Sequence, residues 1–339
     1  MAVLRFGILS TANIAQKALI PAIQRANNAE VKAIASGSGK AGEVARSLHI
    51  PKTYDSYEAL LEDPEIDAVY IPLPNHLHKE WVIKAAQAGK HVLVEKPAAL
   101  NARDTKEMVD ACRQHGVTFM EAFMYQFHPQ HERVKEVMAS GEIGEVQLMR
   151  ASFSFYLGNR DKNIRMDPEK GGGSIYDIGC YCLHTFRNIL GKEAASVMVK
   201  GEVDSDFGVD TSAYGIIEME NGIPAMFDCS FNMPFRTVYE VIGTKGKITI
   251  PRAYRPDNEG DVGIVRIEKD EESREEKMSG DQYKLQVEHF SKAAMSGGKL
   301  KYTGEHTIRN MELIDACYES LRQNKEVEVK NRALPNEVC

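Results

Sequence analysis

The sequence has too few cysteines, with the wrong spacing, for a disulfide scaffold or a zinc site. Six cysteines occur among 339 residues, and no two of them form a CxxC pair. Small disulfide-stapled domains have closely spaced cysteines, and zinc sites use paired cysteines or histidines. The histidines also lack an HxxxH pattern beside an acid. We therefore expect no metal site, and a reduced chain of the kind found in the cytoplasm.

Long apolar runs and an excess of positive charge are also missing. No apolar run approaches the length that spans a membrane, and no leader-like pattern precedes the first strand-like segment. The chain has 42 basic and 49 acidic residues, a net charge of −7, whereas nucleic-acid binding requires a clustered basic face. We therefore expect neither a membrane nor a nucleic acid as partner.

What is present is an ordinary globular composition in a chain long enough for two domains. Hydrophobic residues make up 43% and charged residues 27%, and 339 residues exceed the size at which a single core stops growing. Up to residue 120, strand-like and helical segments alternate, which predicts βαβ units and a parallel sheet. The predicted strands are 3–9, 31–36, 68–71, 91–94 and 117–120, and the predicted helices are 14–26, 41–48, 58–62, 76–88 and 104–115.

From residue 146 onward the pattern changes to consecutive strands. Turn signals at 220–222 and 244–246 join some of them as hairpins. The pattern therefore predicts a mainly antiparallel sheet, with surface loops at 251–260 and 270–277. The predicted strands are 146–156, 195–202, 212–219, 225–231, 238–242 and 247–250, and the predicted helices are 130–139, 282–295 and 305–321.

The stretch at the centre of the first half is residues 91–97, HVLVEKP. Its apolar and β-branched residues predict a buried parallel strand, and Pro97 ends the strand because proline cannot continue a ladder. Lys96 therefore lies at the carboxyl end of a central strand, where open α/β sheets bind ligands. A lysine there can serve as a charge, a donor or a proton relay. The alternative is a surface lysine paired with Glu95.

The turn after the first strand has the small residues of a nucleotide-binding turn, without a full GxGxxG motif. We predict Ser10 or Thr11 as the N-cap of the next helix. The first helical N–H groups and the positive dipole end then point at an anion. The alternative is a plain βα turn. The predicted cofactor contacts in this turn are Gly7, Ser10, Thr11, Ala12, Asn13 and Ile14.

These patterns predict an α/β fold with two domains. Residues 1–122 are expected to form a dinucleotide-binding Rossmann domain with a doubly wound parallel sheet. Residues 123–339 are expected to form an α+β domain with a large open, mainly antiparallel sheet, for substrate binding and oligomerisation. The C-terminal helix is expected to pack back on the first domain.

The end of the second strand favours NADP over NAD. NAD sites usually place an acidic residue there to bind the ribose 2′-hydroxyl, but residues 35–40 read ASGSGK and the first acid is Glu43. Hydroxyl groups, glycines and a lysine suit a 2′-phosphate, so we predict NADP, with NAD as a possible cofactor. The alternative is a flexible loop without a ligand. The predicted contacts are Ser36, Gly37, Ser38 and Lys40.

Residues 72–78, PLPNHLH, form a second turn at the same edge of the predicted sheet. Its two prolines make the turn rigid, and Asn75 is expected to cap the following helix or to contact the cofactor. The further predicted cofactor contacts are Pro72, Leu73, Asn75, His78, Glu95 and Lys96.

The second half contains another group of polar residues in residues 171–184, GGGSIYDIGCYCLH. Three glycines allow the backbone to approach a ligand or another chain segment closely. In the helix predicted to follow, Asp177, Tyr181 and His184 are at i, i+4 and i+7 and share one face. The alternative is that Tyr181 packs in the core and its hydroxyl bonds Asp177.

The stretches EKP, IPLPNH, EAFMYQFHP and GGGSIYDIGCYCLH closely resemble the glucose–fructose oxidoreductase, inositol dehydrogenase and rhizopine catabolism family, over essentially the whole chain. The most similar branch contains dimeric dihydrodiol dehydrogenases and NADP-dependent xylose dehydrogenases. The resemblance implies that Lys96 and Tyr181 are the catalytic pair and Asp177 the acidic site residue. Gly37 and Gln126 depart from the branch, which often has arginine at both positions.

The resemblance implies an NAD(P)-dependent dehydrogenase or reductase. It would transfer a hydride between nicotinamide and a carbinol or carbonyl carbon of a sugar, polyol or cyclic diol, of the aldose 1-dehydrogenase or trans-dihydrodiol dehydrogenase type. A nearby ammonium group lowers a phenol pKa from about 10, so Tyr181 is predicted as the acid/base and Lys96 as the residue that tunes it. The alternatives are an inositol or keto-sugar enzyme and a non-catalytic nucleotide-sensing regulator. The predicted substrate contacts are Asn163, Arg165, Asp177, Tyr181 and His184.

The strands of the second half also predict association. They have apolar residues on both faces, such as Phe227, Phe231 and Val241. Helices are expected to cover one face of the sheet, and the other face then needs a cover. We therefore expect a homodimer or a dimer of dimers.

Overall fold

The computed structural model describes residues 2–270 and 272–330 and divides into two compact units. The first unit contains the chain up to Met124 together with Tyr283–Ile308. The second contains Tyr125–Gln282 and the chain from Arg309 onward. The boundary after residue 122, as a division between two functional domains, stays a prediction.

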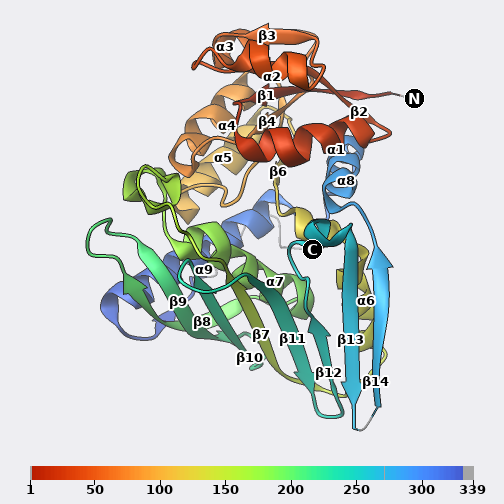
Figure 1. Cartoon of the computed structure of the whole chain (residues 1–339), viewed down its shortest axis with the longest axis vertical. Coiled ribbons are helices and arrows are strands. Elements are labelled where there is room, and N and C mark those ends of the chain that lie inside the picture. The colour runs from red at the N-terminus through yellow and green to blue at the C-terminus, as the bar shows by residue number, and fades with distance from the viewer. Residues whose placement is uncertain (1, 271, 331–339) are drawn as a thin grey trace. The chain divides into compact units, whose positions relative to one another are not determined.

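The first unit is built on a six-stranded parallel sheet with the strand order β3-β2-β1-β4-β5-β6 (Figure 1). This order reverses between β1 and β4, which is the point where doubly wound sheets bind ligands outside the carboxyl ends of the strands. The predicted Rossmann-type sheet is confirmed. The strands are β1 Leu4–Leu9, β2 Ala29–Ala35, β3 Lys52–Tyr54, β4 Ala68–Ile71, β5 His91–Val94 and β6 Phe119–Glu121, and the helices are α1 Ile20–Arg25, α2 Ala41–Ser47, α3 Tyr57–Leu61, α4 His78–Gln87, α5 Ala102–Gln114 and α8 Gln282–Ser296.

The central strands of this sheet are buried on both faces, as continuous apolar runs predict. All four residues of β4 and the last three residues of β5 are buried. β3 was not predicted from the sequence, because it has three residues and none of them is buried. Short, half-exposed edge strands have no clear hydrophobic periodicity.

The second unit contains a nine-stranded sheet with the order β14-β13-β12-β11-β7-β10-β9-β8-β15. Neighbouring strands are antiparallel except for β7 and β10, which pair in parallel. The predicted mainly antiparallel sheet is therefore confirmed. The strands are β7 Val146–Ser154, β8 Ala194–Val203, β9 Asp210–Met219, β10 Pro224–Ser230, β11 Arg236–Gly243, β12 Lys247–Ile250, β13 Val262–Lys269, β14 Glu272–Ser279 and β15 Val327–Glu328, and the helices are α6 Pro129–Ala139, α7 Cys180–Leu190 and α9 Gly304–Gln323, which begins in the first unit.

Of the two predicted surface loops of this unit, the one at 270–277 is wrong, whereas residues 251–260 contain no α-helix or strand. Residues 272–279 form β14, which pairs with β13 along its length. β14 is an edge strand with mostly exposed charged side chains, and charge on an edge strand prevents pairing with another chain. That composition hides the strand from a search for apolar periodicity. In the other loop, Ala253 and Tyr254 are fully buried.

Helices cover one face of the nine-stranded sheet. α7 packs against β7 and β10, and α6 packs against β13 and β14. In Figure 1, α7 lies behind the strands. Phe227, Phe231 and Val241, which we gave as examples of apolar residues on both faces, are all buried, so none of them is exposed on the open face.

No helix in residues 2–270 and 272–330 is both long and apolar enough to cross a membrane. In the same residues, no three His, Cys, Asp or Glu side chains gather in a way that could hold a metal ion. The cysteines of this part of the chain are free thiols, and all of them are buried.

Candidate active site

Lys96 follows β5 directly, at the carboxyl edge of the six-stranded sheet. β5 pairs with β4 on one side and β6 on the other, and the Glu95 N–H extends this ladder by donating to the Ile71 carbonyl at 3.1 Å. The Glu95 carboxylate accepts hydrogen bonds from the hydroxyl of buried Tyr70 and from the Lys96 N–H. Glu95 is thus anchored to the neighbouring strand, and Lys96 begins the loop that leaves the sheet.

The buried side chain of His78 contacts the backbone of this loop. Its ring is fully buried. Nε2 lies 2.8 Å from the carbonyl oxygen of Leu73, and Nδ1 lies 3.1 Å from those of Pro97 and Ala98. We therefore assign His78 a positioning role, in place of the predicted cofactor contact, because the ring joins the 72–78 turn to the EKP loop from inside the core.

Glu121, at the end of β6, is a residue of this region that the sequence analysis missed. Its side chain is fully buried. The carboxylate accepts a hydrogen bond from the Ala98 N–H at 2.9 Å and another from the Tyr302 hydroxyl at 3.2 Å. A buried carboxylate requires such partners, so the backbone two residues after Lys96 is held in place. The only signal in the sequence was an acid that closes a short apolar strand.

The buried ring of His78 predicts a loss of stability in acid. Burial lowers its pKa to about 4, against about 6.5 in the unfolded chain. The folded state resists protonation of His78, so the contribution of the neutral ring to the free energy of unfolding is complete above pH 6.5. This contribution is lost as the pH falls toward 4. At about 1.4 kcal/mol per pKa unit the loss is about 3 kcal/mol. Urea unfolding between pH 7 and 4 should show a shallower pH dependence for His78→Asn than for wild type, whereas exposed His115→Asn should follow wild type. Parallel curves for all three proteins would contradict it.

The helix after β1 begins within one residue of the predicted start at residue 14, but its N-cap differs from the prediction. A π-helical turn, Ala15–Leu19, precedes α1, and its N-cap is Ile14 without a side-chain cap. The predicted N-cap role of Ser10 or Thr11 is therefore wrong. Ser10 has a φ of 136°, which favours glycine, and its hydroxyl accepts the Ala12 N–H at 3.0 Å. This tight turn of small residues at the carboxyl end of β1 suits the close approach of a phosphate group.

Gly7 has a packing role of its own. A Cβ atom at this position would lie 2.5 Å from a methyl group of Leu60 on α3 and 3.2 Å from a methyl group of Ile66. Packing within the first unit therefore accounts for the glycine.

The loop after β2 fits a 2′-phosphate better than a ribose hydroxyl. Ser36 is buried, and its Oγ lies 2.8 Å from the Oγ of Ser38. Gly37, Ser38 and Lys40 are exposed, and Lys40 is the N-cap residue of α2. No carboxylate stands in residues 36–40. The loop thus combines hydroxyls, a lysine and a helix start, which are groups that favour an anion.

In the 72–78 turn, Pro72 and Leu73 are buried and Asn75 is half-buried. Asn75 begins a 3₁₀ turn, and α4 has no side-chain cap, so the predicted capping role of Asn75 is wrong.

In the second unit, the glycine run allows two chain segments to approach closely. A Cβ atom on Gly172 would lie 2.6 Å from the Arg165 carbonyl oxygen. Gly173 has a φ of 118°, and its Cβ would lie 2.1 Å from Oδ1 of Asp210. At Gly172 and Gly173, the groups that approach the backbone closely are therefore other segments of the chain.

Asp210 fixes the start of the helical segment that carries the site residues. Its buried carboxylate accepts hydrogen bonds from the Ser174 hydroxyl at 2.7 Å, the Ile175 N–H at 2.8 Å and the Tyr318 hydroxyl at 2.9 Å. Burial raises the pKa of Asp210. No local pattern in the sequence indicates this residue, because its partners are distant in the chain.

Tyr181 lies on α7 and is surrounded by aromatic rings. The predicted single helix consists of a π-helical turn, Ile175–Gly179, followed by α7. The Tyr181 ring is 6% exposed. Its centroid lies 5.3 Å from Tyr254, 5.4 Å from Phe153 and 5.8 Å from Tyr125. Packing on several sides holds the ring in one orientation.

His184 is buried in the same cluster. Its ring is 1% exposed, and Nδ1 lies 2.5 Å from the Tyr125 hydroxyl, which also accepts a hydrogen bond from Thr185 at 2.9 Å. The structure thus places His184 in the core, and we assign it support of the aromatic cluster in place of the predicted substrate contact. Gln126, which replaces the arginine expected in this branch, is also buried.

Asp177 pairs with Arg165. The guanidinium Nε donates to the Asp177 carboxylate at 2.6 Å, and the Asn163 side chain accepts the Arg165 N–H at 3.1 Å. The structure therefore brings together three of the predicted substrate contacts.

Comparisons with known proteins agree with this architecture. Residues 4–123 match the oxidoreductase family with an NAD-binding Rossmann fold, and residues 131–249 match the GFO/IDH/MocA C-terminal domain. D-xylose 1-dehydrogenase (NADP(+)) 2 of Haloferax volcanii is 41% identical over 96% of this chain and 99% of its own. Trans-1,2-dihydrobenzene-1,2-diol dehydrogenase of Mus musculus is 32% identical over 75% of this chain and 76% of its own. The crystal structure of KijD10, a 3-ketoreductase from Actinomadura kijaniata in complex with NADP and TDP-benzene, has a TM-score of 0.89 and 29% identity, and the match covers 94% of this chain and 98% of KijD10.

Proposed function

The chain belongs to the GFO/IDH/MocA family of oxidoreductases, and we propose that it is an NAD(P)-dependent dehydrogenase or reductase that acts on a sugar, polyol or related cyclic diol. The observation that carries this proposal is the position of Lys96, directly after β5 at the carboxyl edge of a doubly wound sheet. The nicotinamide group supplies or accepts the hydride when the cofactor is bound.

Tyr181 is assigned as the acid/base. It takes a proton from the substrate hydroxyl during oxidation and returns it during reduction. A phenol with a pKa of about 10 is a poor base near neutral pH. The ammonium group of Lys96 is assigned to stabilise the phenolate and so lower that pKa. Asp177 and Arg165 orient the substrate hydroxyls, which raises the rate by holding the reacting groups in a productive geometry.

A substrate panel tests this function. Xylose, glucose, myo-inositol and a trans-dihydrodiol would each be supplied with NADP or NAD, and the absorbance of reduced nicotinamide would be followed. Turnover of a sugar or diol supports the proposal. Tight nucleotide binding without turnover of any compound would favour the nucleotide-sensing regulator instead.

The cytoplasmic location stays a prediction.

NADP is proposed as the preferred cofactor over NAD. Gly37 is proposed to limit this preference, because it has no side chain that could bind the 2′-phosphate. A Cβ atom there meets no atom within 4 Å. Gly37→Arg should therefore fit, and its guanidinium should add a charge-assisted hydrogen bond to the 2′-phosphate. Such bonds contribute roughly 1.5–3 kcal/mol, so the ratio of NAD to NADP dissociation constants should rise about tenfold or more.

Gly37→Ala is the matched control and should leave the ratio of dissociation constants unchanged. Both constants would be measured by fluorescence titration at one salt concentration, because salt weakens phosphate binding. A wild-type protein that prefers NAD would contradict the cofactor proposal.

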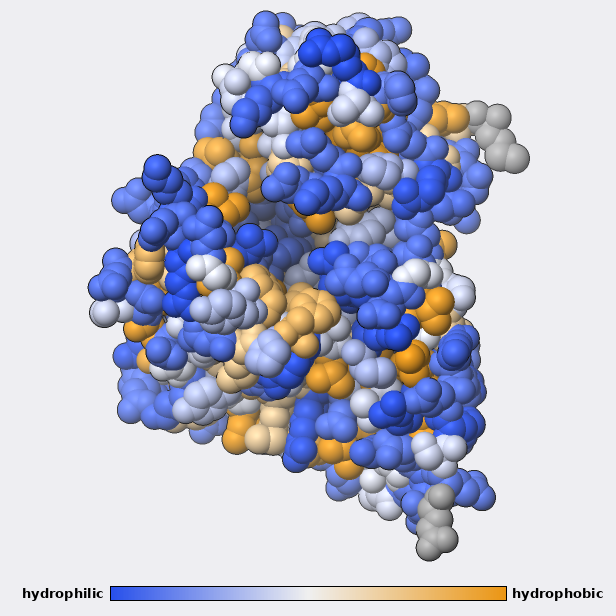
Figure 2. Space-filling view, viewed as in Figure 1, coloured by the Kyte–Doolittle hydropathy of each residue, from blue (hydrophilic) through white to orange (hydrophobic). Residues whose placement is uncertain are grey.

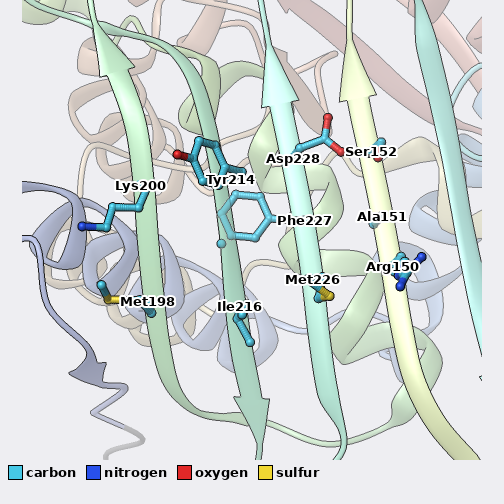
Figure 3. Close-up of a pocket in the computed structure, with 11 residues that line it drawn as sticks. Arg150, Ala151, Ser152, Met198, Lys200, Tyr214, Ile216, Met226, Phe227 and Asp228 are labelled. Atoms are coloured by element: carbon cyan, nitrogen blue, oxygen red, sulfur yellow. Dashed lines mark hydrogen bonds between the residues drawn. The ribbon is translucent and has the colours of Figure 1, made fainter.

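A homodimer through the open face of the nine-stranded sheet is also proposed. Tyr214 is 58%, Ile216 51% and Met226 38% exposed, and Figure 2 shows apolar residues gathered on this face. They surround a hollow of about 420 Å³ that Figure 3 shows on the side of the sheet away from the helices. An exposed apolar patch of this kind is typical of a protein interface. The residues lining the hollow are Arg150, Ala151, Ser152, Met198, Lys200, Tyr214, Gly215, Ile216, Met226, Phe227 and Asp228.

Ile216→Glu should separate the subunits, because it places a charge in an apolar interface. Wild type at micromolar concentration should sediment as a dimer or dimer of dimers, and the variant should sediment as a smaller species. Met295→Glu, at another exposed apolar residue outside this unit, should sediment as wild type. A monomeric wild type would rule out the proposed dimer.

A further inference from the structure

We propose that the ion pair between Arg165 and Asp177 determines substrate charge, so that the site selects an uncharged diol or sugar over a substrate with a carboxylate beside its hydroxyls. This inference rests on the proposed function and names the substrate class within it. The comparisons include enzymes named for xylose, for a dihydrodiol and for dTDP-linked sugars, so family membership alone leaves the substrate charge open.

Both partners are held in place before a ligand arrives. The Gly173 N–H donates to the Arg165 carbonyl at 2.9 Å, and the Asn163 side chain accepts the Arg165 N–H. Asp177 lies in the π-helical turn whose start is fixed by Asp210. Neither residue needs to reorganise in order to form the pair, so a ligand meets a preformed group.

The pair is accessible and close to Tyr181. The side chain of Arg165 is 40% exposed and that of Asp177 is 17% exposed. The carboxylate of Asp177, together with a smaller contribution from the Tyr181 phenol, raises the pKa of Arg165. Only Nε of the guanidinium hydrogen-bonds another side chain in residues 2–270 and 272–330. Its two terminal nitrogens therefore remain as donors for a ligand.

A neutral diol suits this arrangement chemically. A hydroxyl group can donate to a carboxylate and accept from a guanidinium, so two adjacent hydroxyls can bind while the ion pair stays intact. A substrate carboxylate can only accept. At the terminal nitrogens of Arg165 it would meet a guanidinium whose charge Asp177 already neutralises, and it would be repelled by the Asp177 charge, which is how a site discriminates against a wrong ligand.

Glucose and glucuronate form a suitable pair of probes, because they differ by a carboxylate in place of a terminal hydroxymethyl group. Wild type should have a kcat/KM at least tenfold higher for glucose. Asp177→Asn removes the repelling charge and releases the guanidinium, so the glucose-to-glucuronate ratio should fall at least tenfold. Arg165→Gln leaves the carboxylate unopposed, so the ratio should rise. A merely structural role would lower both activities together and leave the ratio unchanged.

Asp167→Asn is the control, because Asp167 is a carboxylate of the same segment paired with Lys170, and it should leave the ratio at the wild-type value. The dissociation constants of both sugars for the enzyme–NADP complex would be measured by calorimetry. The preference for binding glucose over glucuronate should fall in Asp177→Asn and rise in Arg165→Gln. If no sugar is turned over, the proposed function fails while these constants still test the ion pair. Preference of wild type for glucuronate, equal shifts in all three variants, or no binding of either sugar would overturn the inference.

Discussion

Replacement of Tyr181 by Phe is expected to lower kcat about 10²–10⁴-fold, because general acid–base catalysis contributes a factor of that size. The substitution removes one hydroxyl and little volume, and the ring contacts with Phe153 and Tyr254 do not require the hydroxyl. The fold and the cofactor affinity should therefore stay near wild type. Initial rates, NADP dissociation constants and thermal unfolding of the same samples would separate these effects.

Tyr254→Phe is the matched control, since Tyr254 is a fully buried neighbour of Tyr181. Loss of its hydroxyl should change kcat only a few-fold. The pH–rate profile of wild type should have a limb that reports the titration of the acid/base, and Tyr181→Phe should lack this limb. A packing defect would leave the limb in place. Near-native turnover by Tyr181→Phe would show that the assignment is wrong. His184, which shares the predicted helix face with Tyr181, is buried against Tyr125, so Asp177 is the residue to test next.

Lys96→Ala should lower kcat at least as much as Tyr181→Phe, and it should also weaken NADP binding. The change removes the charge assigned to lower the Tyr181 pKa and a contact to the cofactor. The Tyr181→Phe, Lys96→Ala double variant should be little worse than the worse single variant, because groups that act as a unit give non-additive losses. Rates and dissociation constants for the two single variants and the double variant would complete the cycle.

Lys106→Ala, which removes an exposed lysine paired with Asp110 on α5, is the control for loss of a lysine and should behave as wild type. Multiplicative losses in the double variant would contradict the assignment, since they would mean that the two residues contribute independently.

The parts of the fold that the sequence predicted well are those with strong local patterns. The parallel strands are continuous apolar runs between turn signals, and the hairpins of the second unit follow their turn residues. Strand β14 was not predicted, because an exposed charged edge strand has no apolar face that a sequence pattern could reveal. The N-cap of the first helix was also predicted wrongly. Ser10 has the composition of an N-cap, but its hydroxyl bonds the N–H of Ala12 within the turn.

By itself, the sequence determined the family, the two types of sheet and the positions of Lys96, Asp177 and Tyr181, because each of these depends on residues close together in the chain. Only the tertiary structure decided what surrounds them. Glu121 bonds Ala98 from 23 residues away, and Asp210 bonds Ser174 from 36 residues away. A hydrogen bond between distant residues leaves no period or spacing in the sequence, since it forms only when folding brings both groups out of water and into one place.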